Sequence, residues 1–220
     1  MPDPTAPEAR EVAARNAQHF SRVSRVRLSA PERRAALVAT ACRVFSEGSY
    51  RGTTTAEIAR EAGITEPILY RHFESKRELY LECFRNTWER VRETWEQVLE
   101  DEPDPANWVS AMGRAYVRLQ SEDAAIATLW LQSLAEASDD PEICSFTRAH
   151  MREVHDFVTG VMRRAQEAGG IPRDRDPEAE AWIFIGVGLL LTVDQRLGDL
   201  LTDDFERVVA SRRRWLTGRD

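Results

Sequence analysis

The stretch from Thr54 to Phe73, TTAEIAREAGITEPILYRHF, constrains the fold more strongly than any other part of the chain. Thr54 followed by Glu57 forms a capping box, which satisfies free backbone N–H groups where a helix begins. Gly63 is suited to end that helix, because a left-handed backbone conformation costs glycine little. The stretch therefore predicts two short helices around a tight turn.

The apolar and polar residues of this stretch are expected on opposite sides of the two helices. Helical spacing places Ile58, Ala59 and Ala62 on the inner side of the first helix, and Ile68, Leu69 and Phe73 on that of the second. Thr65 provides the second N-cap. An ordinary helical hairpin would fit, but the outward residues match a helix-turn-helix whose second helix reads DNA: Glu66, Pro67, Tyr70, Arg71 and His72.

The longer block TTAEIAREAGITEPILYRHFESKREL resembles the DNA-binding motif of the tetracycline-repressor (TetR) family of bacterial regulators. It carries the Tyr-x-His-Phe-x-x-Lys signature, here Tyr70, His72, Phe73 and Lys76. The motif resemblance covers about residues 30 to 80, and only the helical layout matches beyond it. The resemblance implies an all-α fold with an N-terminal helix-turn-helix domain and a C-terminal helical domain that binds an effector and dimerises.

The resemblance also implies roles for individual residues. Those expected to contact DNA phosphates are Thr54, Tyr70, His72 and Lys76. Those expected to face or flank the bases are Thr65, Glu66, Pro67, Ile68 and Arg71. The sequence departs from the family at Glu66-Pro67, where members often carry Lys-Gly or similar small residues. Glu66 would either accept a hydrogen bond from a cytosine amino group or favour the helix N-terminus.

The predicted domain organisation has three parts. Residues 1–28 form a flexible arm whose Arg22, Arg25 and Arg27 are suited to a minor groove. Residues 29–78 form the DNA-binding domain, which opens with the capping box Ser29-x-x-Glu32. Residues 79–220 form the effector-binding and dimerisation domain, and a further capping box, Ser75-x-x-Glu78, starts a helix that runs to about Asp101.

Asp-Pro pairs recur at 104–105, 140–141 and 176–177, and each is a favourable helix start. The three segments share no apolar or glycine pattern, so we reject a helical repeat. The helices predicted in the C-terminal region are 105–121, 123–137, 141–168, 177–198 and 203–217. The segment AWIFIGVGLLLTV, residues 181–193, is apolar all round and too short to span a bilayer. By resemblance, 177–198 and 203–217 pair with those of a second subunit in a homodimer.

Charge is unevenly distributed along the chain of 220 residues, whose net charge is −7. Basic residues exceed acidic ones in residues 1–77, whereas the acidic excess lies after residue 77, away from the predicted DNA contacts. The polar start MPDPTAPEAR is no signal sequence, and no run of eighteen apolar residues occurs, so we expect a cytoplasmic protein. Cys42, Cys83 and Cys144 lack metal-ligand spacing and are expected as buried free thiols.

Candidate sites in the C-terminal domain favour binding over catalysis. His150 and His155 lack the HExxH spacing of zinc ligands, and no nucleophile motif or phosphate loop occurs, so we expect no enzyme, metal or cofactor. Aromatic residues from several helices are either simply core or the lining of a pocket for a hydrophobic or aromatic effector. The predicted pocket residues are Trp88, Trp95, Met112, Tyr116, Trp130, Phe146, His150 and Trp182. The alternative function is a helical protein-interaction module whose hairpin binds a protein partner.

Overall fold

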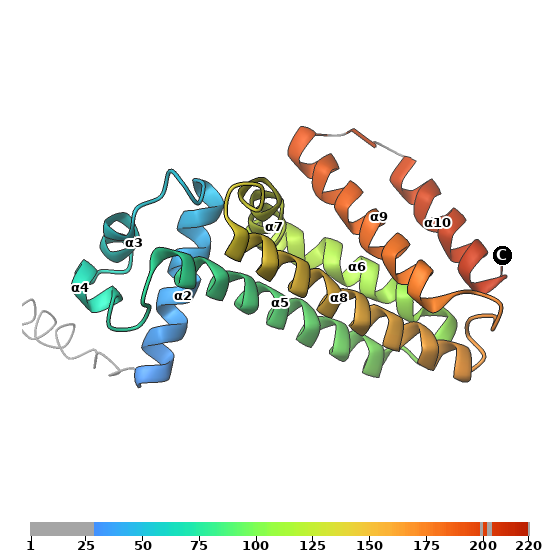
Figure 1. Ribbon diagram of the computed structural model, residues 1–220. Coiled ribbons are helices and arrows are strands. Elements are labelled where there is room, and N and C mark those ends of the chain that lie inside the picture. The colour runs from blue at the N-terminus through green and yellow to red at the C-terminus, as the bar shows by residue number, and fades with distance from the viewer. Residues whose placement is uncertain (1–28, 199, 202–203, 220) are drawn as a thin grey trace, which may run out of the picture. The chain divides into compact units, whose positions relative to one another are not determined.

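The computed structural model describes residues 29–198, 200–201 and 204–219, and its described residues are helical or in loops (Figure 1). The described residues up to Ala35 and those from Ala36 onward form two units. Ser29 caps the start of α2 (Ala30–Glu47). The Glu32 amide donates to the Ser29 hydroxyl, and the Ser29 amide donates to the Glu32 carboxylate. These hydrogen bonds lower the pKa of Glu32. The predicted capping box is therefore present.

The helix-turn-helix consists of α3 (Thr55–Glu61) and α4 (Glu66–Leu69). Thr54 caps α3 by accepting a hydrogen bond from the Glu57 amide at 3.2 Å. The turn passes through Gly63, whose φ of +67° is a left-handed conformation that glycine adopts without strain. Ile64 then joins the core beneath α3 and α4. The predicted pair of short helices around a tight turn is confirmed.

The remaining helices follow the expected order. Ser75 caps the long helix α5 (Lys76–Asp101), accepting from the Glu78 amide at 3.0 Å. Each Asp-Pro pair starts a helical segment, because the Asp104, Asp140 and Asp176 side chains accept hydrogen bonds from backbone amides that follow. The helical segments after α5 are η1 (Pro105–Asn107), α6 (Trp108–Glu122), α7 (Ala125–Glu136), α8 (Pro141–Glu167), α9 (Pro177–Leu197) and α10 (Asp204–Thr217), of which η1, α8 and α9 start at the Asp-Pro pairs.

One buried cluster lies under the helix-turn-helix and continues into the C-terminal helices. It includes Phe45 of α2, Leu69 of α4 and Tyr80 of α5, together with Leu129 of α7 and Ile143 of α8. The predicted boundary between residues 78 and 79 therefore lies inside α5 and within a shared core. The helix-turn-helix is stabilised by apolar surface that α7 and α8 provide.

A second cluster lies among the C-terminal helices. In Figure 1, α5 and α8 run side by side, and α9 packs along α8. Trp88 and Trp95 of α5 pack there with Val158 and Met162 of α8 and with Ala181 of α9. In the part of the chain that the structure describes, no helix is both long and apolar enough to cross a membrane.

Five sequence expectations need correction or lie outside the described residues. Helix α4 ends at Leu69 instead of reaching Phe73, and Ile68 is 38% exposed and not on an inner face. Cys144 is only half-buried, unlike Cys42 and Cys83. The first Asp-Pro pair opens a short 3-10 turn before α6. The arm with Arg22, Arg25 and Arg27 lies outside the described residues.

Gly170 packs directly against the backbone at η1, and this contact generates a stability prediction. A Cβ atom at residue 170 would overlap the carbonyl carbon of Pro105 and the amide nitrogen of Ala106. Gly170→Ala should therefore lower the free energy of unfolding by about 1–3 kcal/mol in urea denaturation. Gly160→Ala in α8 is the control, because a Cβ atom there meets nothing within 4 Å. That variant should be neutral or slightly stabilising, and equal destabilisation of both would contradict the packing argument.

Candidate DNA-binding surface and ligand cavity

A small hydrogen-bonded group fixes the start of α4 against α3. The Thr55 hydroxyl donates to the Glu66 carboxylate and lies 3.1 Å from the Tyr70 hydroxyl. Thr55 is buried, whereas Tyr70 is 46% exposed. Glu66 is therefore held at its inner side by α3 while α4 presents Pro67, Ile68 and Arg71 to solvent. This placement agrees with the predicted outward set for Pro67, Tyr70 and Arg71, whereas Glu66 and His72 are half-buried.

Most basic side chains of residues 36–77 are engaged in contacts within the chain. Arg43 pairs with Glu47 and Glu61, and Arg60 pairs with Glu61. Arg71 is exposed and forms no ion pair or side-chain hydrogen bond with any described residue. It is thus the cation of this region that is open to an external anion.

Lys76, predicted to contact a phosphate, is turned toward the domain. Its ammonium group donates to the Thr53 carbonyl at 2.8 Å and lies 4.6 Å from the centre of the Tyr50 ring. Partial burial lowers the pKa of Lys76, against the opposing field of Glu136. Because Thr53 directly precedes the N-cap of α3, Lys76 fixes the position of that helix. Its phosphate contact stays a prediction.

Ion pairs connect the helix-turn-helix region to the corner between α7 and α8. Arg51 pairs with Glu136 at 3.0 Å and with Asp139, while Arg77 pairs with Asp140 at 2.9 Å and with Glu142 at 2.7 Å. The Gln132 amide also donates to the Gly48 carbonyl at 2.9 Å. Part of the basic excess of the helix-turn-helix region therefore forms ion pairs that hold this region on α7 and α8.

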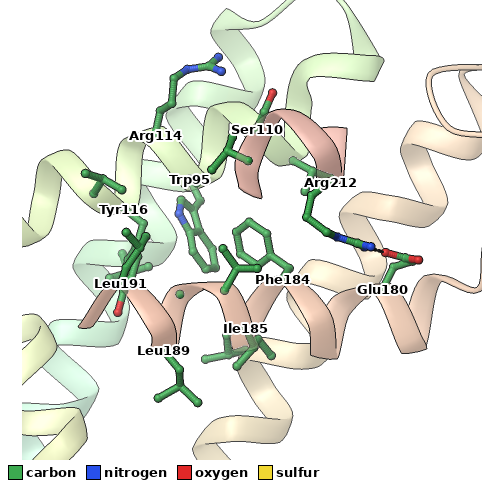
Figure 2. A pocket seen from close by; sticks show the side chains of 18 of the residues that line it. Trp95, Ser110, Arg114, Tyr116, Glu180, Phe184, Ile185, Leu189, Leu191 and Arg212 are labelled. Atoms are coloured by element: carbon green, nitrogen blue, oxygen red, sulfur yellow. Dashed lines mark hydrogen bonds and ion pairs between the residues drawn. The ribbon is translucent and has the colours of Figure 1, made fainter. Parts of the chain in front are cut away.

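A cavity of about 380 Å³ lies among the C-terminal helices. Lining residues come from α5 to α10, and the end that Phe84, Trp130 and His150 line adjoins the buried cluster under the helix-turn-helix. In Figure 2, Trp95 and Phe184 face each other within it, with ring centres 5.7 Å apart, and the Glu180–Arg212 ion pair lies to one side. The volume is in the range of small-molecule sites.

The structure brings together most of the predicted pocket residues. Trp88, Trp95, Tyr116, Trp130 and His150 line the cavity. The three others do not line it, which corrects the sequence expectation: Met112, Phe146 and Trp182. Met112 is fully buried and accepts a hydrogen bond from Trp95 through its carbonyl. Phe146 lies behind His150, and Trp182 is exposed and stacks on His155.

Sequence reasoning missed several lining residues of different kinds. Phe84 lies one turn before Trp88 on the same face of α5, so helical spacing indicated it. Phe184 lies in the apolar stretch of α9. Glu180, directly before that stretch, pairs with Arg212 of α10. No sequence signal identified that pair. Within the described ranges, no three His, Cys, Asp or Glu side chains are grouped so as to hold a metal ion.

Comparison with known proteins agrees with both parts of this arrangement. Residues 37–83 match the model of bacterial regulatory proteins of the tetR family, and residues 105–187 match the C-terminal model of BetI-type transcriptional repressors. The chain belongs to the TetR family. It is accordingly a DNA-binding transcriptional regulator with a ligand-binding C-terminal domain, and a protein-interaction module is not favoured.

Relatives and solved structures place this TetR-family member among transcriptional regulators. It is 28% identical to the transcriptional activator FasR of Mycolicibacterium smegmatis over 76% of this chain and 72% of that protein. It is 29% identical to the probable regulator ArpR of Pseudomonas putida over 90% of this chain and 95% of that protein. The crystal structure of Bacillus subtilis FadR in complex with stearoyl-CoA shares the fold, with a TM-score of 0.69, 14% identity and coverage of 83% and 97%.

The inward position of Lys76 predicts a structural effect for its removal. Lys76→Ala loses a charge-assisted hydrogen bond to the Thr53 carbonyl, so the free energy of unfolding should fall by about 1 kcal/mol. Arg71→Ala, which removes an exposed cation that pairs with no described residue, should leave the free energy of unfolding unchanged. Urea denaturation of both variants checks this, and an unchanged midpoint for Lys76→Ala would refute the structural role.

Proposed function

We propose that this regulator is a repressor that binds a pseudo-palindromic operator as a homodimer and is released by a hydrophobic or aromatic effector. The match of residues 105–187 to a repressor model supports repression. The proposal includes no catalytic role, and it places the protein in the cytoplasm, where its DNA lies. The observation that carries it is that one helix, α5, adjoins the helix-turn-helix at its start and lines the cavity further along.

The DNA-binding surface is assigned to the exposed side of α3 and α4. Pro67, Ile68 and Arg71 project from α4, and Thr65 is exposed just before it. We assign base contacts to these residues and phosphate contacts to Thr54, Tyr70 and His72. Glu66, held by Thr55, is assigned to the helix N-terminus, where a carboxylate is favoured, and to a cytosine amino group within reach. Lys76 completes the predicted phosphate set.

Exposed apolar residues on α9 support dimerisation. Trp182, Ile183 and Leu197 are 45%, 41% and 66% exposed, and Trp215 on α10 is also exposed. Ile183, Leu190 and Leu197 recur every seven residues, so they form one stripe along α9. A second subunit that covers this stripe would bury it in a four-helix bundle. The two-fold assembly would then present two recognition helices to half-sites about 34 Å apart.

Helix α5 supplies the mechanical connection from cavity to DNA. Trp88 and Trp95 lie roughly 20–30 Å along this helix from Lys76. An effector that displaces α5 near the tryptophans would shift the two helix-turn-helix units of a dimer out of register with the half-sites. A coupling of about 1–3 kcal/mol would lower operator affinity roughly 5–150-fold, and operator DNA would weaken effector binding by the same factor.

Selection of bound fragments from random or genomic DNA tests the DNA-binding proposal and yields the operator. On that operator, Arg71→Ala should weaken binding and reduce the slope of log affinity against log salt by at most about 1, because the bases lose the cation assigned to them. Arg92→Ala is the matched control, since it removes the same charge from α5, where Arg92 pairs with Glu89 and Glu96. Equal affinities and slopes for Arg71→Ala and the unmodified protein would rule out the assigned surface.

The proposed dimer interface is tested by placing a charge in the α9 stripe. Ile183→Glu should weaken dimerisation at least about tenfold in analytical ultracentrifugation, because an unpaired carboxylate would be buried between subunits. Leu134→Glu is the control, because Leu134 on α7 is 45% exposed and lies outside the stripe. If both variants kept the association state of the unmodified protein, α9 would not be the interface.

A further inference from the structure

Polar groups on the cavity wall are mostly occupied by partners within the chain. The Trp88 indole N–H donates to the Glu153 carboxylate at 2.8 Å, and that of Trp95 donates to the Met112 carbonyl at 3.0 Å. Glu180 accepts from Arg212 and from the Trp215 indole at 3.0 Å. These groups hold the wall together and are not available to a ligand without loss of those bonds.

His150 differs, because its imidazole lines the cavity and neither ring nitrogen bonds to a described residue. Aromatic rings fix its orientation: Phe146 is stacked at 6.3 Å and 7°, while Trp88 and Phe84 approach edge-on at 5.8 and 6.2 Å. Desolvation by this burial lowers the pKa of His150, although Glu153 acts in the opposite direction. The ring is therefore neutral at physiological pH, with one donor and one acceptor nitrogen.

No charged residue from α5, α7 or α8 lines the cavity, and the nearby Glu153 of α8 is bonded to Trp88. The lining residues from α5, α7 and α8 are apolar, aromatic or uncharged. The charged lining residues come from α6, α9 and α10: Arg114, Glu180, Glu206, Arg212 and Arg213. On α7, the Trp130 indole N–H has no acceptor among the described residues. This end thus offers apolar surface with a few hydrogen-bonding groups.

We propose that the effector is an uncharged aromatic molecule with a hydroxyl group, and that His150 binds this hydroxyl at the end of the cavity formed by α5, α7 and α8. The inference rests on the proposed effector-regulated function. A hydroxyl both donates and accepts, so it can bond to either nitrogen of a neutral imidazole, to the donor or to the acceptor. A carboxylate or ammonium group would enter an apolar end without a free counter-charge and would pay a large desolvation cost.

His150 also contacts the core of the helix-turn-helix region. Its ring packs on Phe84, which lines the cavity and belongs to the same buried cluster as Tyr80 and Phe45. A hydroxyl held by His150 would press the effector against Phe84. Recognition of the effector and displacement of α5 therefore occur at one place.

The test uses the full chain and two probes that differ by one hydroxyl group, naphthalene and β-naphthol, at neutral pH. Affinities are measured by quenching of tryptophan fluorescence and by calorimetry. β-Naphthol should bind about 3- to 10-fold more tightly than naphthalene, the effect of one buried hydrogen bond. His150→Phe should abolish this preference and leave naphthalene binding unchanged, which also shows that the variant is folded. His150→Gln should restore part of the preference.

Thr159→Val is the control, because it removes a buried hydroxyl from the same helix, α8, at a residue that does not line the cavity. That variant should keep the preference of the unmodified protein. Equal binding of both probes, or a preference that survives in His150→Phe, would overturn the role of His150 and leave the effector-regulated function standing. If neither probe bound, the aromatic effector itself would be refuted, while DNA binding would still be judged from the Arg71→Ala titration.

Discussion

The edge-on packing of Phe84 against Tyr80, with ring centres 5.2 Å apart, joins the two working parts of the molecule. Tyr80 continues the contact to Phe45 and Tyr50, at 5.0 and 4.7 Å, beneath the helix-turn-helix. On the other side, Phe84 forms part of the cavity wall. The DNA-reading helices consequently have no core of their own that is separate from the regulatory helices, and a change in the wall next to Phe84 reaches them through packed rings.

Polar contacts also connect these two parts and fix their relative orientation. Asp140 caps α8 by accepting from the amides of Glu142 and Ile143, and it also pairs with Arg77 in the first turn of α5. Desolvation raises the pKa of Asp140, but the Ile143 amide and the Arg77 guanidinium outweigh it, so the pKa lies below its ordinary value. One carboxylate thus holds the start of α8 and the start of α5 together. Apolar rings resist separation of the two parts, whereas this pair resists rotation between them.

The helices and the family were predictable from sequence because the relevant signals are local. Capping residues such as Ser75 and Asp140 act on amides two or three residues away, so neighbouring letters reveal them. The end of α4 was missed because the four-residue spacing of Leu69 and Phe73 fits a continuous helix. In the structure, turns follow α4, and amides there bond to carbonyls three residues back, as in His72 to Leu69. The inward direction of Lys76, and the choice of His150 over Phe146 for the cavity wall, depend on packing between distant segments. Spacing along one helix carries no information on such contacts.

The short length of α4 limits how many base pairs one subunit can read through this helix. Four residues span about 6 Å, roughly the rise of two base-pair steps. Direct readout by α4 alone therefore distinguishes few of the roughly 10⁶–10⁹ competing sites of a genome. In the proposed dimer, the missing information comes from a second copy of the same short helix and from the fixed distance between the two. In such a dimer, sequence recognition depends on the distance between the two helices as much as on their base contacts. An effector then needs only to change that distance.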